Sequence, residues 1–177
     1  SLRWFRDTFY PGTTYDQLTA LATDKAPGAD GLIFFPYQSG PGTLDLPQSV
    51  RGGWYGLELN HSSGHFVRAI MESLAYVLRQ NLETMQSGGT TYEEIRSIGG
   101  GASSGVWNQI KANVTGKRVA TMECPEAASL GMAVLSAAAL GVHASLPAAV
   151  SAMVRRTDSL EPDPTAVQIY QEQYERY

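Results

Sequence analysis

Three consecutive glycines, Gly99 to Gly101, are the residues best placed to do chemistry in this sequence. They follow a short apolar run typical of a strand and precede small residues that open a helical pattern. Glycine lacks a Cβ, so its backbone amides can approach a ligand closely. The helix behind them adds unpaired N–H groups and the positive end of its dipole. Such a turn can hold a phosphate or the polar edge of a nucleotide, and a purely structural strand-to-helix turn is the alternative.

Two known phosphate-binding motifs can be tested on the spacing around this turn. A P-loop ends in Gly-Lys-Ser/Thr, and Lys111 lies too far away, so the P-loop is excluded. A dinucleotide fingerprint needs G-x-G-x-x-G, and Gly99, Gly101 and Gly105 miss that spacing by one residue. Glu123 does lie near the distance at which that fold carries its acidic residue. An NAD-binding dehydrogenase domain is therefore weakened as an alternative but stays open.

Composition narrows the class of protein. A chain of 177 residues with 43% hydrophobic and 17% charged residues is long and apolar enough for one globular domain. The net charge is −4 and the basic residues are scattered, so we expect no nucleic-acid partner. Apolar runs are too short for a bilayer, so we expect no membrane partner. The single cysteine, Cys124, excludes an intrachain disulfide and fits a cytoplasmic location.

Hydrophobic periodicity predicts an α/β layered domain with at least one parallel crossover, because strands alternate with helices. The segments expected to be helical are 2–9, 14–26, 63–87, 103–114, 125–140 and 164–177. The segments expected to be strands are 31–37, 54–59, 95–98 and 118–122, with a long loop over 38–53. The first residues already read as helix interior, so we expect a chain cut out of a longer one.

Three ordered motifs resemble the FGGY carbohydrate kinases, close to their xylulose-kinase branch. "IGGGASSGVWNQIKANVTGKRV" (98–119) resembles the adenosine-binding segment of that family, and "EAASLGMAVLSAAALGV" (126–142) is similar to the Ala/Gly helix that follows it. Upstream, "GGWYGLELNHSSGHFVRAIME" (52–72) resembles the family's C-terminal signature. The resemblance extends from about Leu2 to Val142.

The resemblance implies a fold and an activity. It implies a ribonuclease-H-like nucleotide-binding domain of the actin, Hsp70 and hexokinase type. Residues 1–177 would be the partial C-terminal ATP-binding domain, lacking its first strands, and the N-terminal sugar-binding domain would be absent. Such kinases transfer the γ-phosphoryl of MgATP to a hydroxyl of xylulose or a related sugar or polyol, so ATP and Mg²⁺ are the implied cofactors. ATP, ADP and the sugar are the implied partners, and a homodimer is a further expectation. A non-catalytic ATP-sensing module of the same superfamily is the second candidate.

The resemblance also implies which residues bind the nucleotide. Gly100, Gly101 and Ala102 would bring backbone against the adenosine and the ribose–phosphate. Ser103 and Ser104 would donate further hydrogen bonds at the helix start. The family's catalytic base is an Asp that would precede Ser1, so no residue of this chain is expected to be catalytic or to bind metal directly. Four aspartates do not lie in that motif: Asp7, Asp16, Asp24 and Asp30.

We expect other polar residues near the motifs to have structural roles. Glu72 lies deep in an apolar helix and should pair with Arg68, its i−4 neighbour. His61 and His65 flank a helix start, so capping or packing is favoured over catalysis.

Four residues of the helix after the glycine turn and one segment of the long loop remain. Trp107 should belong to the core, whereas Asn108 and Gln109 should be solvated on a helix surface. Asn113 and Gly40 to Thr43 depart from the residues usual in the family.

Overall fold

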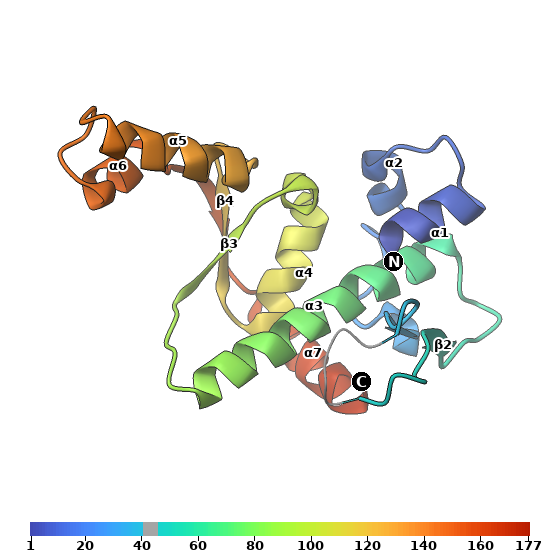
Figure 1. Cartoon of the computed structure of the whole chain (residues 1–177). Helices are drawn as coiled ribbons and strands as arrows, with labels where there is room; N and C mark the ends of the chain where they lie inside the picture. The colour runs from blue at the N-terminus through green and yellow to red at the C-terminus, as the bar shows by residue number, and fades with distance from the viewer. Residues whose placement is uncertain (41–45) are drawn as a thin grey trace.

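Short strands and helices alternate in the computed structural model, which describes residues 1–40 and 46–177 (Figure 1). The helices are α1 (Leu2–Phe9), α2 (Tyr15–Ala20), α3 (Ser63–Ser87), α4 (Gly105–Thr115), α5 (Ala127–Ala139), α6 (Leu146–Met153) and α7 (Pro164–Arg176). The strands are β1 (Ile33–Phe35), β2 (Gly53–Tyr55), β3 (Glu94–Ser97), β4 (Arg118–Met122) and β5 (Arg156–Leu160). Two 3₁₀ turns, η1 (Ala29–Gly31) and η2 (Gly100–Ser103), complete the elements that position the site. Of the helices in the described part of the chain, none is long and apolar enough to cross a bilayer.

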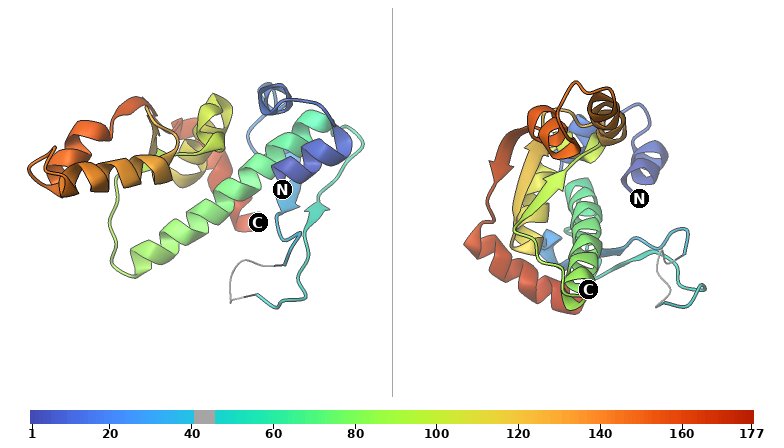
Figure 2. Two further views of the ribbon diagram at one scale, coloured as in Figure 1. Left: turned by 45° about the horizontal axis from the view of Figure 1, so that its top comes forward. Right: turned by 60° about the vertical axis from the view of Figure 1, so that its left-hand side comes forward.

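The long helix α3 runs through the middle of the molecule, with α1 and α2 near one end of it (Figures 1 and 2). Apolar residues at helical spacing explain why it is buried: Val67, Ile70 and Met71 have no exposed surface. Ser62 begins the helix with a capping box. The predicted helix over 63–87 is confirmed.

A three-stranded sheet with the order β3-β4-β5 holds the predicted parallel crossover. β3 pairs in parallel with β4, with Ile95 opposite Val119, and α4 connects them. β5 pairs with the other edge of β4 in the antiparallel direction. This topology places the glycines of η2 at the carboxyl end of β3, directly before α4.

The two N-terminal strands form a separate antiparallel pair in which Phe34 lies opposite Trp54. Their ring centroids are 4.5 Å apart, and both rings contact the core cluster around α3. Both strands are shorter than predicted, because η1 ends at Gly31 and the pairing stops at Tyr55. Within the predicted loop 38–53, residues 41–45 lie outside the described residues. They include all but Gly40 of the segment Gly40 to Thr43, whose sequence departs from the family.

Two elements near the C-terminus were not predicted. α6 carries helix-start signals, because Ser145 accepts a hydrogen bond from the Ala148 N–H and a proline follows in the first turn. β5 shows no apolar alternation, since four of its five residues are exposed. The hairpin of α5 and α6 lies beyond the sheet, away from α1 and α2 (Figure 2).

A buried ionic cluster joins α3 to α7 and to the turn before β1. Glu72 is 2% exposed, and its Oε1 accepts hydrogen bonds from Arg68 Nε at 2.8 Å and Tyr170 Oη at 2.7 Å. The Gly28 N–H donates to the same oxygen at 3.0 Å. Burial raises the pKa of the Glu72 carboxyl, and the Arg68 guanidinium and the three hydrogen bonds oppose that rise. The predicted Arg68–Glu72 pair is confirmed.

Replacing Glu72 with Gln should destabilise the fold strongly, because it leaves the Arg68 charge buried without a counter-ion. We expect a loss of about 3–5 kcal/mol in the free energy of unfolding, measured by urea denaturation. Glu83→Gln is the matched control, since Arg79 and Glu83 form the same i, i+4 pair near the surface of α3. That variant should lose about 1 kcal/mol or less. Equal losses in the two variants would contradict the prediction.

Candidate functional site

The glycine turn η2 is held at the end of β3 by main-chain hydrogen bonds. Gly99 has φ +74°, a left-handed conformation that favours glycine, and its N–H donates to the Pro125 carbonyl at 3.0 Å. That bond ties the turn to the segment after β4. The Ala102 N–H donates back to the Gly99 carbonyl at 3.0 Å, so the chain folds tightly around the two glycines between them.

Ser103 ends the turn η2 and Ser104 is the residue before α4, which begins two residues later than predicted, and both hydroxyls have partners in the chain. Ser104 is the N-cap, and its Oγ accepts from the Trp107 N–H at 3.3 Å. Ser103 Oγ donates to the Gly100 carbonyl at 2.9 Å. By contrast, neither the Gly100 nor the Gly101 N–H has a protein acceptor among residues 1–40 and 46–177. The main-chain amides of Gly100 and Gly101 are therefore available as donors, and the Ser104 hydroxyl, which only accepts from Trp107, keeps its own hydrogen for donation.

Trp107 explains why a side chain is excluded at the third glycine. A Cβ on Gly101 would lie 3.0 Å from Cζ3 of the Trp107 ring, closer than ordinary packing allows. The indole contacts the core, and its Nε1–H donates to the Met71 carbonyl at 3.3 Å, so the predicted core role of Trp107 is confirmed. A Cβ on Gly100 would meet no atom within 4 Å.

A cavity of about 360 Å³ opens on one side of the turn, within the range typical of small-molecule sites. Its walls come from α1, α2, α3 and the start of α4, which are far apart in the sequence. The residues that line it are Ser1, Leu2, Arg3, Tyr15, Asp16, Thr19, Leu74, Gly100, Gly101, Ser103, Ser104 and Trp107. Four of the five residues predicted to bind the nucleotide are thus brought together here, and Ala102 is not among them.

Arg3 and Tyr15 were not identified from the sequence, yet they shape the mouth of this cavity. Arg3 Nε lies 3.5 Å from Tyr15 Oη, and the Arg6 guanidinium lies 4.3 Å from the centre of the Tyr15 ring. Because these contacts are tertiary, no local sequence signal could have predicted them. Arg3 thus lines the same cavity as Gly100 and Gly101.

A second cavity, of about 520 Å³, lies on the other side of the turn and includes Ala102 in its lining. Three carboxylates line it: Glu123, Glu126 and Asp158. These three carboxylates repel a polyphosphate, whereas the first cavity has one carboxylate, Asp16, together with Arg3, which attracts a polyphosphate. The first cavity is therefore the candidate site for an anionic ligand.

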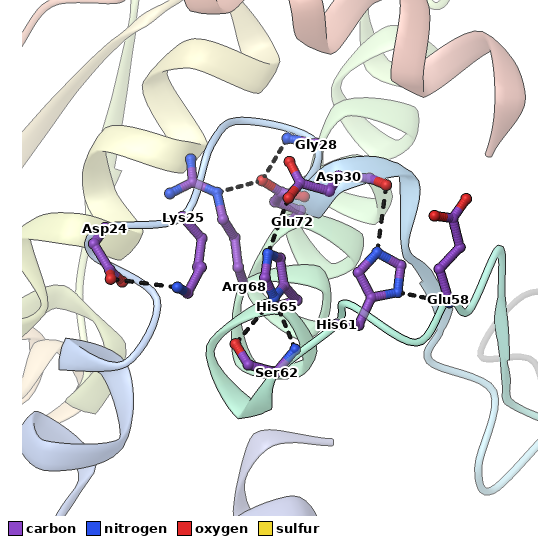
Figure 3. A network of polar contacts seen from close by, with 10 residues as sticks. All are labelled: Asp24, Lys25, Gly28, Asp30, Glu58, His61, Ser62, His65, Arg68 and Glu72. Carbon is purple, nitrogen blue, oxygen red and sulfur yellow. Dashed lines mark hydrogen bonds and ion pairs between the residues drawn. The ribbon is translucent and has the colours of Figure 1, made fainter.

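The two histidines near the start of α3 have structural partners (Figure 3). His65 Nδ1 accepts from the Ser62 N–H at 2.9 Å, and its Nε2 lies 3.1 Å from Asp30 Oδ2. His61 Nδ1 accepts from the Glu58 N–H at 3.0 Å. Acceptance at Nδ1 requires the proton to lie on Nε2 in each neutral ring. The predicted capping or packing is confirmed for His65, which completes the capping box of α3, whereas His61 bonds the loop before the helix, and both histidines are absent from the lining of the two cavities.

The surface role predicted for Asn108 is wrong. Asn108 is 1% exposed, because α4 is covered both by α3 and by the sheet. Ser104, Asn108 and Ala112 recur every four residues, and this second face of small and polar residues was the signal that sequence reasoning missed. Gln109 is partly buried and donates to the Glu161 carbonyl and to Asn113 Oδ1, both at 2.9 Å.

Comparison with known proteins gives this geometry a context. Residues 3–140 match the family described as FGGY family of carbohydrate kinases, C-terminal domain. Xylulose kinase of Staphylococcus epidermidis is 30% identical over 177 residues, which cover 100% of this chain and 36% of that protein. Gluconokinase of Bacillus subtilis is 34% identical over 169 residues, covering 88% of this chain and 32% of that protein. The crystal structure of xylulose kinase from Rhodospirillum rubrum has a TM-score of 0.84 at 29% identity, covering 99% of this chain and 36% of that one.

Lys111, one turn after Asn108, gives the region around the turn a measurable pH dependence. Burial lowers the pKa of its ammonium group to about 8, against about 10.4 in an unfolded chain. Between these values the unfolded chain binds more protons, so this contribution to stability rises with pH. We expect the free energy of unfolding of the unchanged protein to rise, relative to Lys111→Met, as pH increases from about 7.5 to about 10.

Lys117→Met, which also removes one positive charge just after α4, is the control for this measurement. If the difference in the free energy of unfolding between the unchanged protein and Lys111→Met stays constant with pH, the prediction is contradicted.

Proposed function

This chain belongs to the FGGY family of carbohydrate kinases, whose C-terminal domain it matches, and we propose that it forms the nucleotide-binding part of a sugar kinase. In this proposal the γ-phosphoryl of MgATP is transferred to a hydroxyl of xylulose or a related sugar or polyol. The chain spans 36% of the Staphylococcus epidermidis xylulose kinase. The sugar and the catalytic base are accordingly assigned to the rest of the polypeptide.

Membership of the family confirms the predicted resemblance and the α/β fold of ribonuclease-H-like type. It also decides against the NAD-binding dehydrogenase, whose glycine spacing the sequence already misses by one residue. The relatives include both xylulose kinase and gluconokinase, so the family assignment leaves the sugar open.

The cavity between the glycine turn and α1 supports the nucleotide site, and this is the observation that carries the proposal. Arg3 and the free N–H groups of Gly100 and Gly101 favour phosphate oxygens, as in other anion sites at helix starts. Leu74 and the Trp107 ring offer apolar surface to a purine. The remaining predicted residues, Ser103 and Ser104, border the same cavity, whereas Ala102 contributes through its backbone.

Within this proposal the chain positions the nucleotide and neutralises its charge, which is most of what phosphoryl transfer asks of a protein. Mg²⁺ prefers oxygen ligands and usually keeps several waters, with one or two carboxylates and the substrate phosphates as partners. Among the residues that the structure describes, no group of three or more His, Cys, Asp or Glu could hold a metal ion. Asp16 is the single carboxylate that lines the first cavity, and no metal role is assigned to it.

The proposal includes a cytoplasmic location, which the lone Cys124 fits, and no nucleic-acid or membrane partner. A homodimer stays a prediction, which sedimentation of the complete polypeptide can decide. An ATP-sensing module without catalysis is the competing function. Sugar-dependent ADP release by the complete polypeptide supports the kinase, whereas MgADP binding without any release supports the sensor.

Gly100→Val should weaken MgADP binding at least about tenfold, or about 1.4 kcal/mol, because the new side chain projects into the nucleotide cavity. The backbone tolerates the change, since no atom lies within 4 Å of the new Cβ. Binding is measured by titration calorimetry on the complete polypeptide that contains this chain.

Gly105→Val is the matched control, because its Cβ also meets no atom within 4 Å and it lines only the second cavity. Its MgADP affinity should stay close to that of the unchanged protein. Because Gly100 lines both cavities, a loss of affinity in Gly105→Val as well as in Gly100→Val would place the nucleotide in the second cavity and overturn the assignment.

A further inference from the structure

Two buried polar side chains and one partly buried lysine form a cluster behind the glycine turn, between the end of β3 and α4. We name the cluster of Ser97, Asn108 and Lys111 the Asn108 cluster. Ser97 is 5% exposed and donates from Oγ to Asn108 Oδ1 at 2.8 Å. Lys111 Nζ donates to Ser97 Oγ at 2.9 Å and to Asn108 Oδ1 at 3.1 Å. The Ser97 hydroxyl and the Lys111 ammonium thus both donate to Asn108 Oδ1.

The ammonium group of Lys111 determines how the Asn108 amide is oriented. An ammonium group can only donate, so the amide atom that faces it must be the oxygen. The amide nitrogen then points the other way, where it donates to the Ala102 carbonyl at 2.7 Å. This is the shortest hydrogen bond that any side chain makes to the turn in the described part of the chain.

The Asn108 cluster therefore anchors one end of the turn, and the segment after β4 anchors the other. The Gly99 N–H is held by the Pro125 carbonyl, and the Ala102 carbonyl is held by Asn108 Nδ2. Gly100 and Gly101, whose N–H groups have no protein acceptor within residues 1–40 and 46–177, lie between these two points. The direction of the free amides depends on both anchors.

We propose that Asn108 is a positioning residue for the nucleotide, which holds the glycine turn in its binding conformation and is itself oriented by Ser97 and Lys111. The inference rests on the proposed nucleotide site. Asn108 lines only the second cavity, so it would act through the Ala102 carbonyl rather than by contact with the nucleotide.

Asn108→Asp separates this role from simple packing. An aspartate has the same shape and can still accept from Ser97 and Lys111, so the cluster keeps its partners. It cannot donate to the Ala102 carbonyl as a carboxylate, and its second oxygen repels that carbonyl. In the complete polypeptide we expect MgADP to bind about tenfold more weakly, which titration calorimetry measures. The KM for ATP should rise while the KM for xylulose stays the same.

Asn113→Asp is the matched control, because it makes the same chemical change on the same helix. Asn113 Oδ1 only accepts, from Gln109 Nε2 and from the Asp163 N–H, both at 2.9 Å, and a carboxylate accepts both bonds equally well. MgADP affinity should be unchanged in this variant. Its thermal midpoint shows how much of any effect comes from the added charge.

The outcomes distinguish the positioning role of Asn108 from the proposed function of the chain. Unchanged MgADP affinity in Asn108→Asp, with a protein that binds MgADP when unmodified, overturns the positioning role and leaves the proposed function intact. An unmodified protein that does not bind MgADP overturns both. If Asn108→Asp does not fold, Lys111→Met decides, because loss of the ammonium frees the amide to rotate. Weaker MgADP binding by folded Lys111→Met then supports the role, and unchanged binding overturns it.

Discussion

One buried carboxylate constrains the arrangement of the whole chain. Glu72 on α3 takes hydrogen bonds from three separate places: its own helix, α7 and the turn before β1. Removing any one partner leaves a buried polar group unsatisfied, and such a group costs more than an exposed pair gains. In the turn before β1, which carries the Gly28 N–H to Glu72, Ala29 and Asp30 have left-handed φ values of 47° and 52°. Such values are strained for residues other than glycine. Packing and hydrogen bonds offset that local strain.

Two hydrogen bonds connect α3 to α4, the helix that follows the glycine turn. The Trp107 ring of α4 bonds the main chain of α3 at Met71, and Arg79 of α3 donates to the Val114 carbonyl near the other end of α4. α4 is thus held at both ends by α3, and its first turn carries the candidate site. A turn supported by two rigid helices and a sheet keeps its free amides in a constant direction, which a site for an anion requires.

Sequence reasoning succeeded where the signal was local and failed where it was tertiary. Period and capping identified α3, the strand–glycine–helix order and the Arg68–Glu72 pair, because each depends on residues within a few turns of one another. Asn108 was misplaced, since one face of α4 was assumed to be solvated when the sheet covers it. β5 was not predicted, because it is a mostly exposed edge strand that forms by pairing with β4. Arg3 joins the cavity only because α1 folds back toward the turn.

The three glycines that begin the site are required for three different physical reasons. Gly99 supplies a left-handed backbone that brings the chain to the Pro125 carbonyl, and a side chain there would strain it. Gly101 leaves room for the Trp107 ring, which joins the turn to the core. Neither reason applies to Gly100, because its φ is not positive and a Cβ there would meet no atom within 4 Å. A structural turn would tolerate a side chain at Gly100, and in the proposed function a ligand that comes close to the main chain accounts for the glycine there.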